Sequence, residues 1–533
     1  MQQESRRLKY FTLGAMCFSL FMVMLDNTVV NLALPTIGRQ LGSGISGLQW
    51  ILDAFILLLA SLMLTGGTLG DLYGRRRAFM TGLAVFTGGS LFCALSPNIG
   101  SLIAARAIQG VGAAIMMPNT LAIITNTFHD PKERAQAIGI WAGVSGISLA
   151  LGPVLGGVMV DAWGWQSIFY LNVPIGVVAL TVTALVVSES KNPEGRGLDV
   201  AGQVLAVVGL GALTYALIEA NNYGWRSARI VTLLAVGVAT LIAFGLWESR
   251  TKSPMLRLTF FRNMTFTGAN LVGLIISFGF FGMLFFLALF MQNVQGFSAT
   301  GAGVRQLPST IAVMIFAVLS GRIAGRMGAR IPMTIGMFLV GVGLLAFSTV
   351  QATTPYSHYW FFLAVVGVGT GLVMSPMTTA AMSTVPTARA GMASATLNTT
   401  RQVGGVFGIA VLGAIVTDIF ASRLVSALTA LHLPGPVVTQ IAAAAQNSQE
   451  RGSMPNIPGV DVSAIHAAIG NSFTSGLHMA LWVAGPILLV GAAVAAVMIR
   501  HTTPTAQLAR RAEREALAAA ETATAEEQPE VSA

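Results

Sequence analysis

The sequence has few charged residues for its length. Asp, Glu, Lys and Arg make up 10% of its 533 residues, against about 25% in soluble proteins. So little charge cannot cover the surface of a water-soluble fold, and so apolar a chain does not stay disordered. Hydrophobic residues make up 54% and the mean hydropathy is +0.72. The main body of the chain is therefore expected to be an integral membrane protein with many spans.

Cysteine and lysine are also scarce. Cys17 and Cys93, the two cysteines, both lie in apolar segments, which excludes a disulfide framework and a cysteine-rich metal site. None of the four lysines follows a glycine, so the phosphate-binding GxxxxGK[ST] loop is absent. The six histidines mark no metal site. We expect a protein that is not an enzyme and that has no metal and no cofactor.

The net charge is +9, from 30 Lys and Arg against 21 Asp and Glu. A basic balance can indicate a nucleic-acid partner. In a chain this apolar, the better explanation is the excess of Lys and Arg that cytoplasmic loops of membrane proteins carry. We therefore expect a lipid bilayer around the chain and no nucleic acid.

Fourteen apolar segments are long enough to cross a bilayer, which takes about 20 helical residues. The expected fold class is all-α integral membrane with 14 transmembrane helices. The expected spans are residues 10–33, 48–69, 78–96, 102–125, 135–160, 167–188, 199–220, 229–248, 265–291, 302–324, 331–350, 358–383, 393–418 and 476–499.

An even number of spans places both termini on one side, and the basic residues indicate which side. With cytoplasmic termini, 22 of the 30 Lys and Arg fall in cytoplasmic segments and six in outer segments, while Arg106 and Arg401 lie within spans. This is the bias that orients membrane proteins. We expect a multi-pass protein of a prokaryotic cytoplasmic membrane with both termini in the cytoplasm.

An internal repeat divides the chain. A motif from Gly67 to Arg76 returns 254 residues later, from Gly321 to Arg330. Six spans end by residue 188, so a simple doubling would repeat at a shorter distance, and the excess holds two additional spans. Two parallel six-helix halves are a known transporter plan. The predicted organisation is an N-terminal tail (1–9), a six-helix half (10–188), two inserted helices (189–263), a second six-helix half (264–500) with a long outer loop (422–475), and a partly disordered tail (501–533).

Four motifs resemble those of one transporter family. They are residues 25–35 (LDNTVVNLALP), 67–77 (GTLGDLYGRRR), 106–112 (RAIQGVG) and 152–157 (GPVLGG). With the span count, they make residues 10–500 resemble the major facilitator superfamily, in its fourteen-helix drug:proton antiporter branch. The resemblance implies an exporter of small molecules that is driven by protons.

Two acidic residues, Asp26 and Asp53, lie in the outer parts of the first two spans. A carboxylate inside a bilayer is costly unless it faces a partner or a water-filled cavity, and removal from water favours the protonated form of any carboxyl group. Because a short loop joins these spans, we expect the two acids to lie close together, one carrying the proton and the other attracting a cationic substrate. The alternative for each is a structural hydrogen bond between helices. Asn31, in the same motif as Asp26, is a further candidate.

Arg106 lies within the fourth span, where it must be paired or hydrated. The family resemblance implies a role in proton coupling, and the alternative is an ion pair that only packs helices. Gln109 follows one turn later and is expected to share the cavity of Arg106.

The glycine- and arginine-rich motif between spans 2 and 3 is expected to act as a conformational latch. Its members are Gly67, Asp71, Gly74, Arg75 and Arg76. The carboxylate would lie near the N-terminus of a neighbouring helix, which attracts negative charge, and the arginines would pair with acids across the interface between the halves. The alternative is that these arginines only contribute to the cytoplasmic excess of positive charge.

The motif of span 5 combines small residues with a proline. Gly152, Gly156 and Gly157 allow helices to approach closely, and Pro153 kinks the helix. We expect close packing here to seal the two halves against leakage.

Three hypotheses for the function follow. The first is a proton-driven antiporter that exports lipophilic or cationic drugs, powered by the proton motive force. The second is a dedicated exporter of one antibiotic, metabolite or lipid, and the third is a transporter-like sensor or channel. The intramembrane acids and the span 5 motif favour the first two. We expect protons and small lipophilic or cationic compounds as partners, and a monomer.

Overall fold

The computed structural model describes residues 2–191, 197–251, 254–385, 390–446 and 462–500. Within these ranges the chain is almost entirely helical and has no strand. Fourteen helical segments are long and apolar enough to cross a membrane. The predicted fold class, an all-α membrane protein with 14 spans, is confirmed.

The helices fall into three groups along the chain. The first group, which we call the first half, contains α1 (Gln2–Leu41), α2 (Ile45–Tyr73), α3 (Arg75–Ala94), α4 (Ile99–Thr127), α5 (Pro131–Trp163), α6 (Ser167–Tyr170) and α7 (Asn172–Val186). Two helices follow, α8 (Val200–Tyr223) and α9 (Ala228–Arg250). The second half contains η1 (Leu258–Arg262), α10 (Met264–Leu289), η2 (Phe290–Val294), α11 (Ala299–Met327), α12 (Arg330–Phe347), η3 (Tyr356–His358), α13 (Trp360–Met382), α14 (Ala390–Ala430), α15 (Gly435–Gln446) and α16 (Val462–Met498).

Local sequence explains where several helices begin and end. Gly74 has φ +114° and Gly328 has φ +79°, conformations that glycine adopts readily, and these two residues occupy equivalent positions of the repeat. Each ends a helix, α2 and α11 respectively. Asn98 begins α4 with a capping box shared with Ser101, which satisfies two backbone N–H groups at the start of the helix.

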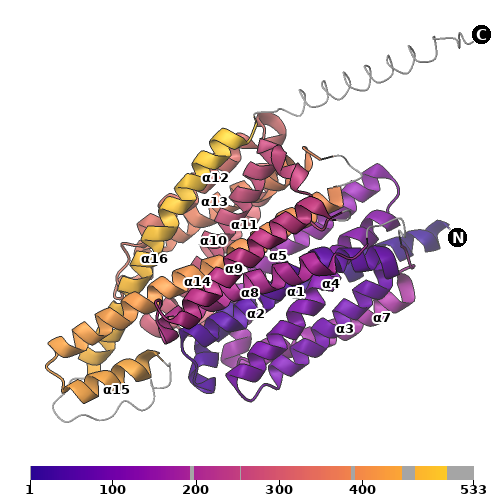
Figure 1. The fold of residues 1–533 in the computed structure, drawn as a ribbon. Coiled ribbons are helices and arrows are strands. Elements are labelled where there is room, and N and C mark those ends of the chain that lie inside the picture. Colours follow the sequence, from indigo (N-terminus) through magenta and orange to yellow (C-terminus); the bar gives the residue numbers. More distant parts are fainter. Residues whose placement is uncertain (1, 192–196, 252–253, 386–389, 447–461, 501–533) are drawn as a thin grey trace, which may run out of the picture.

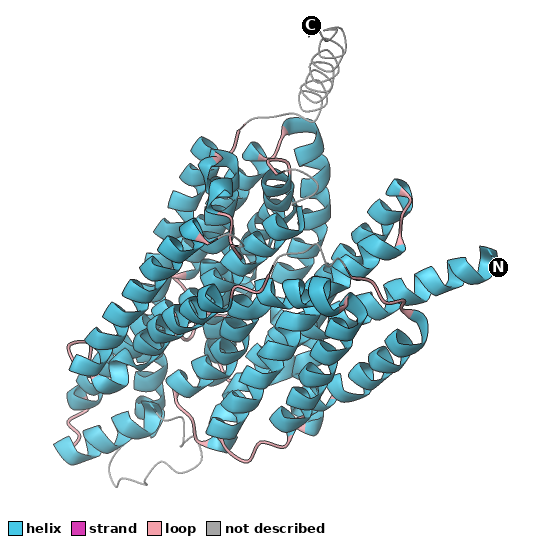
Figure 2. Cartoon of the chain, turned by 45° about the vertical axis from the view of Figure 1, so that its right-hand side comes forward, coloured by secondary structure: helices cyan, strands magenta, loops and turns pink. Residues whose placement is uncertain are grey.

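The halves lie side by side as two bundles (Figures 1 and 2), and Figure 1 shows α8 and α9 running along them. Helix α5 packs on α11, and α2 packs on α14, so these pairs form most of the interface between the halves. Helices α8 and α9 pack on each other, and α8 also contacts α2 and α14. We call the end of the bundle where α1 begins the terminal side, and the opposite end the α15 side.

Helices α14 and α16 extend further on the α15 side than the sequence predicts. The expected spans end at 418 and restart at 476, but α14 runs to Ala430 and α16 begins at Val462. Polar residues interrupt the apolar pattern there, while the two extensions remain helical because they pack on each other, as Phe420 does on Phe473 with ring centroids 6.2 Å apart. Much of the predicted loop 422–475 is therefore helical, and it includes α15 (Figure 1).

Candidate functional site

A buried ion pair joins α1 and α4 inside the first half. The Nη1 atom of Arg106 lies 2.5 Å from Oδ2 of Asp26, and the two side chains are 0% and 1% exposed. The other carboxylate oxygen, Oδ1, accepts hydrogen bonds from the amides of Gln109 at 3.0 Å and Asn172 at 3.1 Å. Both oxygens of Asp26 are thus occupied by donors from other helices.

The surroundings of Arg106 satisfy most of its guanidinium group. Its Nε donates to the carbonyl of Ile51 at 3.0 Å, and its Nη1 also donates to Oε1 of Gln109 at 2.6 Å. The guanidinium carbon lies 4.2 Å from the ring centroid of Phe55, a cation–π distance. Its Nη2 is buried and has no partner among the described residues. The Nη2 atom of Arg106 is therefore available to a further hydrogen-bond acceptor.

Gln109 connects this pair to α3. Its amide nitrogen also donates to Oγ of Ser90 at 2.9 Å, and the thiol of Cys93 lies 3.7 Å from its amide oxygen. The network therefore spans α1, α3, α4 and α7, and it reaches α2 through the backbone carbonyl of Ile51. Loss of either charged member would leave the other charge buried without compensation, which costs about 3–5 kcal/mol in proteins.

Asp53 lies apart from this network. It is fully buried on α2, and neither carboxylate oxygen has a hydrogen-bond partner among the described residues. Gln49, one helical turn earlier, donates from its amide to the carbonyl of Ile409 on α14 at 2.7 Å. Residues four apart share a helix face, so Asp53 lies on the face of α2 toward the second half. The expected contact between Asp53 and Asp26 is not among the contacts of either residue.

Asn31 does not join the network either. Its amide nitrogen donates to the carbonyl of Asn27 in the preceding turn of α1, at 2.9 Å, and its amide oxygen is buried without a partner. This free acceptor faces the interior of the protein, but no described contact links it to Asp26.

The predicted latch forms its contacts within the first half. Asp71 accepts from Nε and Nη2 of Arg75 at 3.0 and 2.8 Å, and Arg76 donates from Nη2 to the carbonyl of Ala184 at 2.5 Å. Glu189, after α7, accepts from the backbone N–H groups of Arg76 and Arg77 at 3.0 and 3.2 Å. The expectation of pairing across the halves is wrong for this conformation, because the arginine side chains find their acceptors within the first half, in Asp71, Glu189 and the Ala184 carbonyl.

The glycines of the latch motif differ in how tightly they are packed. A Cβ at Gly74 would lie 2.7 Å from the carboxylate of Glu189, whereas a Cβ at Gly67 would lie 3.5 Å from Pro118, an ordinary contact. Gly66 and Gly70 are more crowded, with distances of 2.2 Å to the Ala114 carbonyl oxygen and 1.7 Å to Asn119. Close packing of α2 on α4 therefore depends on Gly66 and Gly70 more than on Gly67.

The motif of α5 brings this helix close to two others. A Cβ at Gly152 or Gly156 would lie 1.8 Å from Thr28 or 2.8 Å from Val29, both on α1, and one at Gly157 would lie 2.5 Å from the Ala299 carbonyl oxygen on α11. The carbonyl oxygen of Pro153 lies 2.1 Å from the position of a Cβ at Gly303. Small residues thus allow backbone contact within the first half and between the halves.

Three sets of hydrogen bonds join described residues of the two halves, and all lie toward the α15 side. One is the bond from Gln49 to Ile409. In another, the amide of Gln292 on η2 donates to the carbonyl of Leu32 on α1 at 2.9 Å. In the third, Asp161 at the end of α5 accepts from the backbone N–H groups of Ala299 and Thr300, which begin α11, at 3.1 and 2.8 Å. The halves are therefore fastened together at this end.

Sequence reasoning did not single out Asn172, Glu189, Asp161, Gln49 or Gln292. Each is a polar residue near the end of an apolar segment, where solvated residues are common, so its position alone gave no signal. Among the described residues, no group of three or more His, Cys, Asp or Glu could hold a metal ion.

Comparison with known proteins agrees with this architecture. Residues 16–409 match the model of the Major Facilitator Superfamily. The multidrug resistance protein Stp of Mycobacterium tuberculosis (strain CDC 1551 / Oshkosh) is 39% identical over 439 residues, 82% of this chain and 81% of the relative. The tetracenomycin C resistance and export protein of Streptomyces glaucescens is 35% identical over 496 residues, 91% of this chain and 90% of the relative.

Solved structures show the same fold. A bacterial homologue of the human lysosomal transporter Spinster, in an inward-facing and occupied conformation, superposes with a TM-score of 0.62 at 17% identity. The superposition covers 92% of this chain and 97% of that chain.

Proposed function

Because this chain belongs to the Major Facilitator Superfamily, we propose that it is a proton-driven antiporter that exports lipophilic or cationic compounds across the membrane. The family predicted from four motifs is confirmed by the family match. Relatives that cover most of the chain are multidrug and antibiotic resistance proteins, and this similarity supports a small-molecule substrate and export as the direction of transport.

The observation that carries the proposal is the buried Asp26–Arg106 pair. In a site of low dielectric, a change in the charge of one partner changes the energy of the other by several kcal/mol. Protonation of Asp26 would release Arg106, whose unused Nη2 and neighbouring Gln109 can then adopt new partners. Such a site couples the presence of a proton to the arrangement of α1, α4 and α7.

Asp53 supplies a second, separate acid at the interface of the halves. An ionised carboxylate that is buried without partners is strongly unfavourable, so we infer that Asp53 holds a proton in this conformation. A cationic group entering between α2 and α14 would provide the missing partner and favour release of that proton. Proton and cation would then compete for one carboxyl group, as antiport requires.

We also propose the orientation, membrane and oligomeric state of the protein. The terminal side faces the cytoplasm and the α15 side faces outward, in the cytoplasmic membrane of a bacterium, and the chain acts as a monomer of six, two and six spans. The proton motive force supplies the energy without a bound cofactor. One charge moved across 100 mV provides about 2.3 kcal/mol, enough for a roughly fiftyfold substrate gradient.

Transport by the purified protein in proteoliposomes tests this proposal. An imposed proton gradient should drive accumulation of a fluorescent lipophilic cation, and an ionophore that collapses the gradient should abolish it. Counterflow of substrate without a gradient distinguishes exchange from flux through a channel. A panel of unrelated cations and neutral compounds distinguishes a multidrug exporter from a dedicated one. Flux without counterflow, or accumulation indifferent to the ionophore, would contradict antiport.

A further inference from the structure

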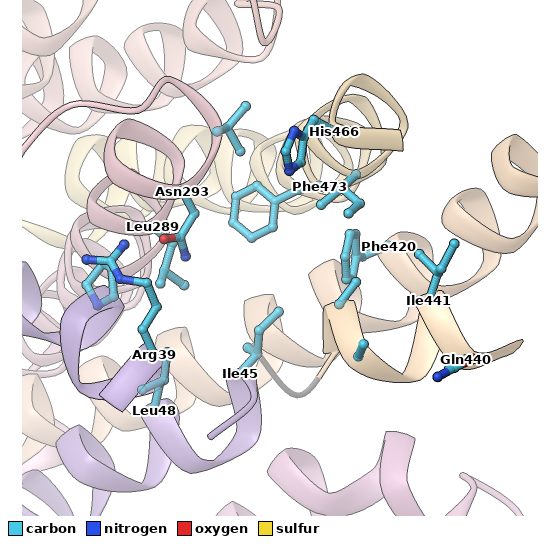
Figure 3. A pocket seen from close by; sticks show the side chains of 16 residues that line it. Arg39, Ile45, Leu48, Leu289, Asn293, Phe420, Gln440, Ile441, His466 and Phe473 are labelled. Carbon is cyan, nitrogen blue, oxygen red and sulfur yellow. The ribbon is translucent and has the colours of Figure 1, made fainter. Parts of the chain in front are cut away.

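A cavity of about 180 Å³ lies on the α15 side between the two halves. The first half contributes the end of α1 and the start of α2, including Arg39 and Leu48. The second half contributes η2, α14, α15 and α16. Figure 3 shows Arg39 and Asn293 on one side of this cavity, Phe420 and Ile441 across from them, and Phe473 and His466 along a third side. The cavity is much larger than the 10–15 Å³ or so that one water molecule needs.

This cavity adjoins the hydrogen bonds that fasten the halves together. Leu48 directly precedes Gln49, and Asn293 directly follows Gln292. A movement that breaks the bonds of Gln49 and Gln292 would therefore also open the floor of the cavity toward the space between the halves. A compound that leaves that space beside Gln49 and Gln292 would meet the cavity.

The walls are apolar and the rim is polar. Phe420, Phe473 and Ile441 are buried, whereas Arg39 and His466 are exposed at the edge. None of the 16 described residues that line the cavity is acidic. This chemistry differs from the interior of the first half, where Asp26 and Asp53 supply carboxyl groups.

The guanidinium group of Arg39, at the rim, has more N–H donors than it uses. Arg39 uses Nη2 for a bond to Oγ1 of Thr36 at 3.1 Å, and a guanidinium group has five N–H donors. Asp161 attracts Arg39 electrostatically, but the described residues form no ion pair between these two side chains, and both oxygens of Asp161 accept from Ala299 and Thr300 at the start of α11. An anionic group at the rim would therefore find an available cation.

From these observations we infer that the cavity is an exit-side binding site for lipophilic compounds that carry one anionic group. The apolar body lies against Phe420 and Phe473, and the anion lies at Arg39. The inference rests on the proposed export function, and it extends the substrate class from cations to lipophilic acids. Compounds of this chemistry are held here before release to the outside.

Photo-crosslinking tests the inference with a benzophenone carboxylate and a matched benzophenone trimethylammonium, both on purified protein in nanodiscs of zwitterionic lipid. The carboxylate should form adducts on α15 and on the start of α16, and the ammonium should form fewer. The double variant Arg39→Gln/His466→Gln should reduce these adducts about tenfold, the effect of a lost charge-assisted hydrogen bond. Arg423→Gln, an exposed change on α14 outside the cavity, is the matched control and should have no effect.

Further arms separate the possible explanations. Ala444→Trp, which fills the cavity from α15, should block both probes. In nanodiscs of anionic lipid, the benzophenone carboxylate should form as many adducts as in zwitterionic lipid. Loss of these adducts in anionic lipid would identify the site as a lipid site and overturn the inference. Equal labelling by the two probes, or labelling that survives the double variant, would also overturn it. Crosslinking needs no proton gradient, so the carboxylate probe should still form adducts in Asp26→Asn. If the probe forms no adducts in the wild-type protein, the exit-side site is rejected but the proposed antiport is not.

Discussion

At the scale of single residues, the first half contains two carboxyl groups in opposite environments. Asp26 is surrounded by Arg106, Gln109 and Asn172, all donors within 3.1 Å. Asp53 is equally buried and has no partner among the described residues. A paired carboxylate is stable as an ion, while an unpaired one is stable when neutral. The two acids are thus suited to different steps of transport.

The Asp26–Arg106 pair predicts strong coupling between its members. Arg106→Met leaves Asp26 buried without a cation and should lower the free energy of unfolding by about 3–5 kcal/mol. The double variant Asp26→Asn/Arg106→Met carries no buried charge and should recover most of that loss. Thermal unfolding of the purified proteins in detergent measures both effects. Additive losses in the double variant would show that the two residues do not interact energetically.

The sequence allowed part of this site to be predicted. Asp26 and Arg106 were evident because charged residues are rare within apolar spans, and Gln109 follows Arg106 by one helical turn. Asn172 was not evident, because its amide is one of many polar groups near helix ends. The absence of a hydrogen bond between Asp53 and the described residues around Asp26 depends on how α1 and α2 are rotated in the bundle, which residue spacing in a single helix does not determine.

At the scale of helices, backbone contact between α2 and α4 depends on glycine. Gly66→Ala would place a methyl group 2.2 Å from the carbonyl oxygen of Ala114, whereas Gly67→Ala would meet Pro118 at 3.5 Å. Overpacking of this kind costs about 1–3 kcal/mol, so Gly66→Ala should lower thermal stability and membrane abundance. Gly67→Ala is the matched control and should behave as wild type. Equal behaviour of the two variants in fluorescence-detected gel filtration would contradict this packing.

Asp161 of the first half also caps the N-terminus of α11 in the second half. A carboxylate at a helix N-terminus is stabilising by about 0.3–1 kcal/mol, and in partly buried sites by up to ~2 kcal/mol. Asp161→Ala removes it and should shift the population toward states open on the α15 side. The distance between fluorophores on α5 and α11, measured by single-molecule energy transfer, reports this shift.

The control for this cap is Asp418→Ala, because Asp418 is an exposed acid on α14. It should leave the distance distribution as in wild type. An unchanged distribution in Asp161→Ala would show that the cap does not hold the α15 side closed.

The helices themselves were largely predictable, and their ends were not. Long apolar segments produced the 14 spans because each must satisfy its own backbone in the membrane. The sequence did not predict the extensions of α14 to Ala430 and of α16 back to Val462. Contacts such as Phe420 with Phe473 stabilise these extensions, which lie beyond the apolar segments expected to span the membrane. Glu189 was likewise missed, since only the fold places it beside Gly74.

At the scale of the whole molecule, the halves are joined on the α15 side through α5–α11, α1–η2 and α2–α14. The hydrogen bonds between described residues of the two halves lie toward that side. If the α15 side faces outward, this conformation is closed to the outside, as expected of a transporter ready to receive substrate from the cytoplasm.

Orientation is tested by labelling of a single cysteine. Thr439→Cys on α15, in a protein from which Cys17 and Cys93 have been removed, should react with a membrane-impermeant maleimide in intact cells. Thr439 is exposed and belongs to segment 422–475, which the sequence predicts to lie outside. Reaction only after permeabilisation would reverse the assignment of the two sides.

We propose that proton movement and substrate movement are coupled through Asp26 and Asp53, and substrate-induced proton release in proteoliposomes measures that coupling directly. With a cationic substrate, wild-type protein should release protons on substrate addition. Asp26→Asn should abolish uphill export, while downhill exchange of substrate persists. Asp53→Asn should reduce the proton release induced by a cationic substrate, and it should affect a neutral substrate less. Full proton release in both variants, with unchanged uphill export, would contradict coupling through these two residues.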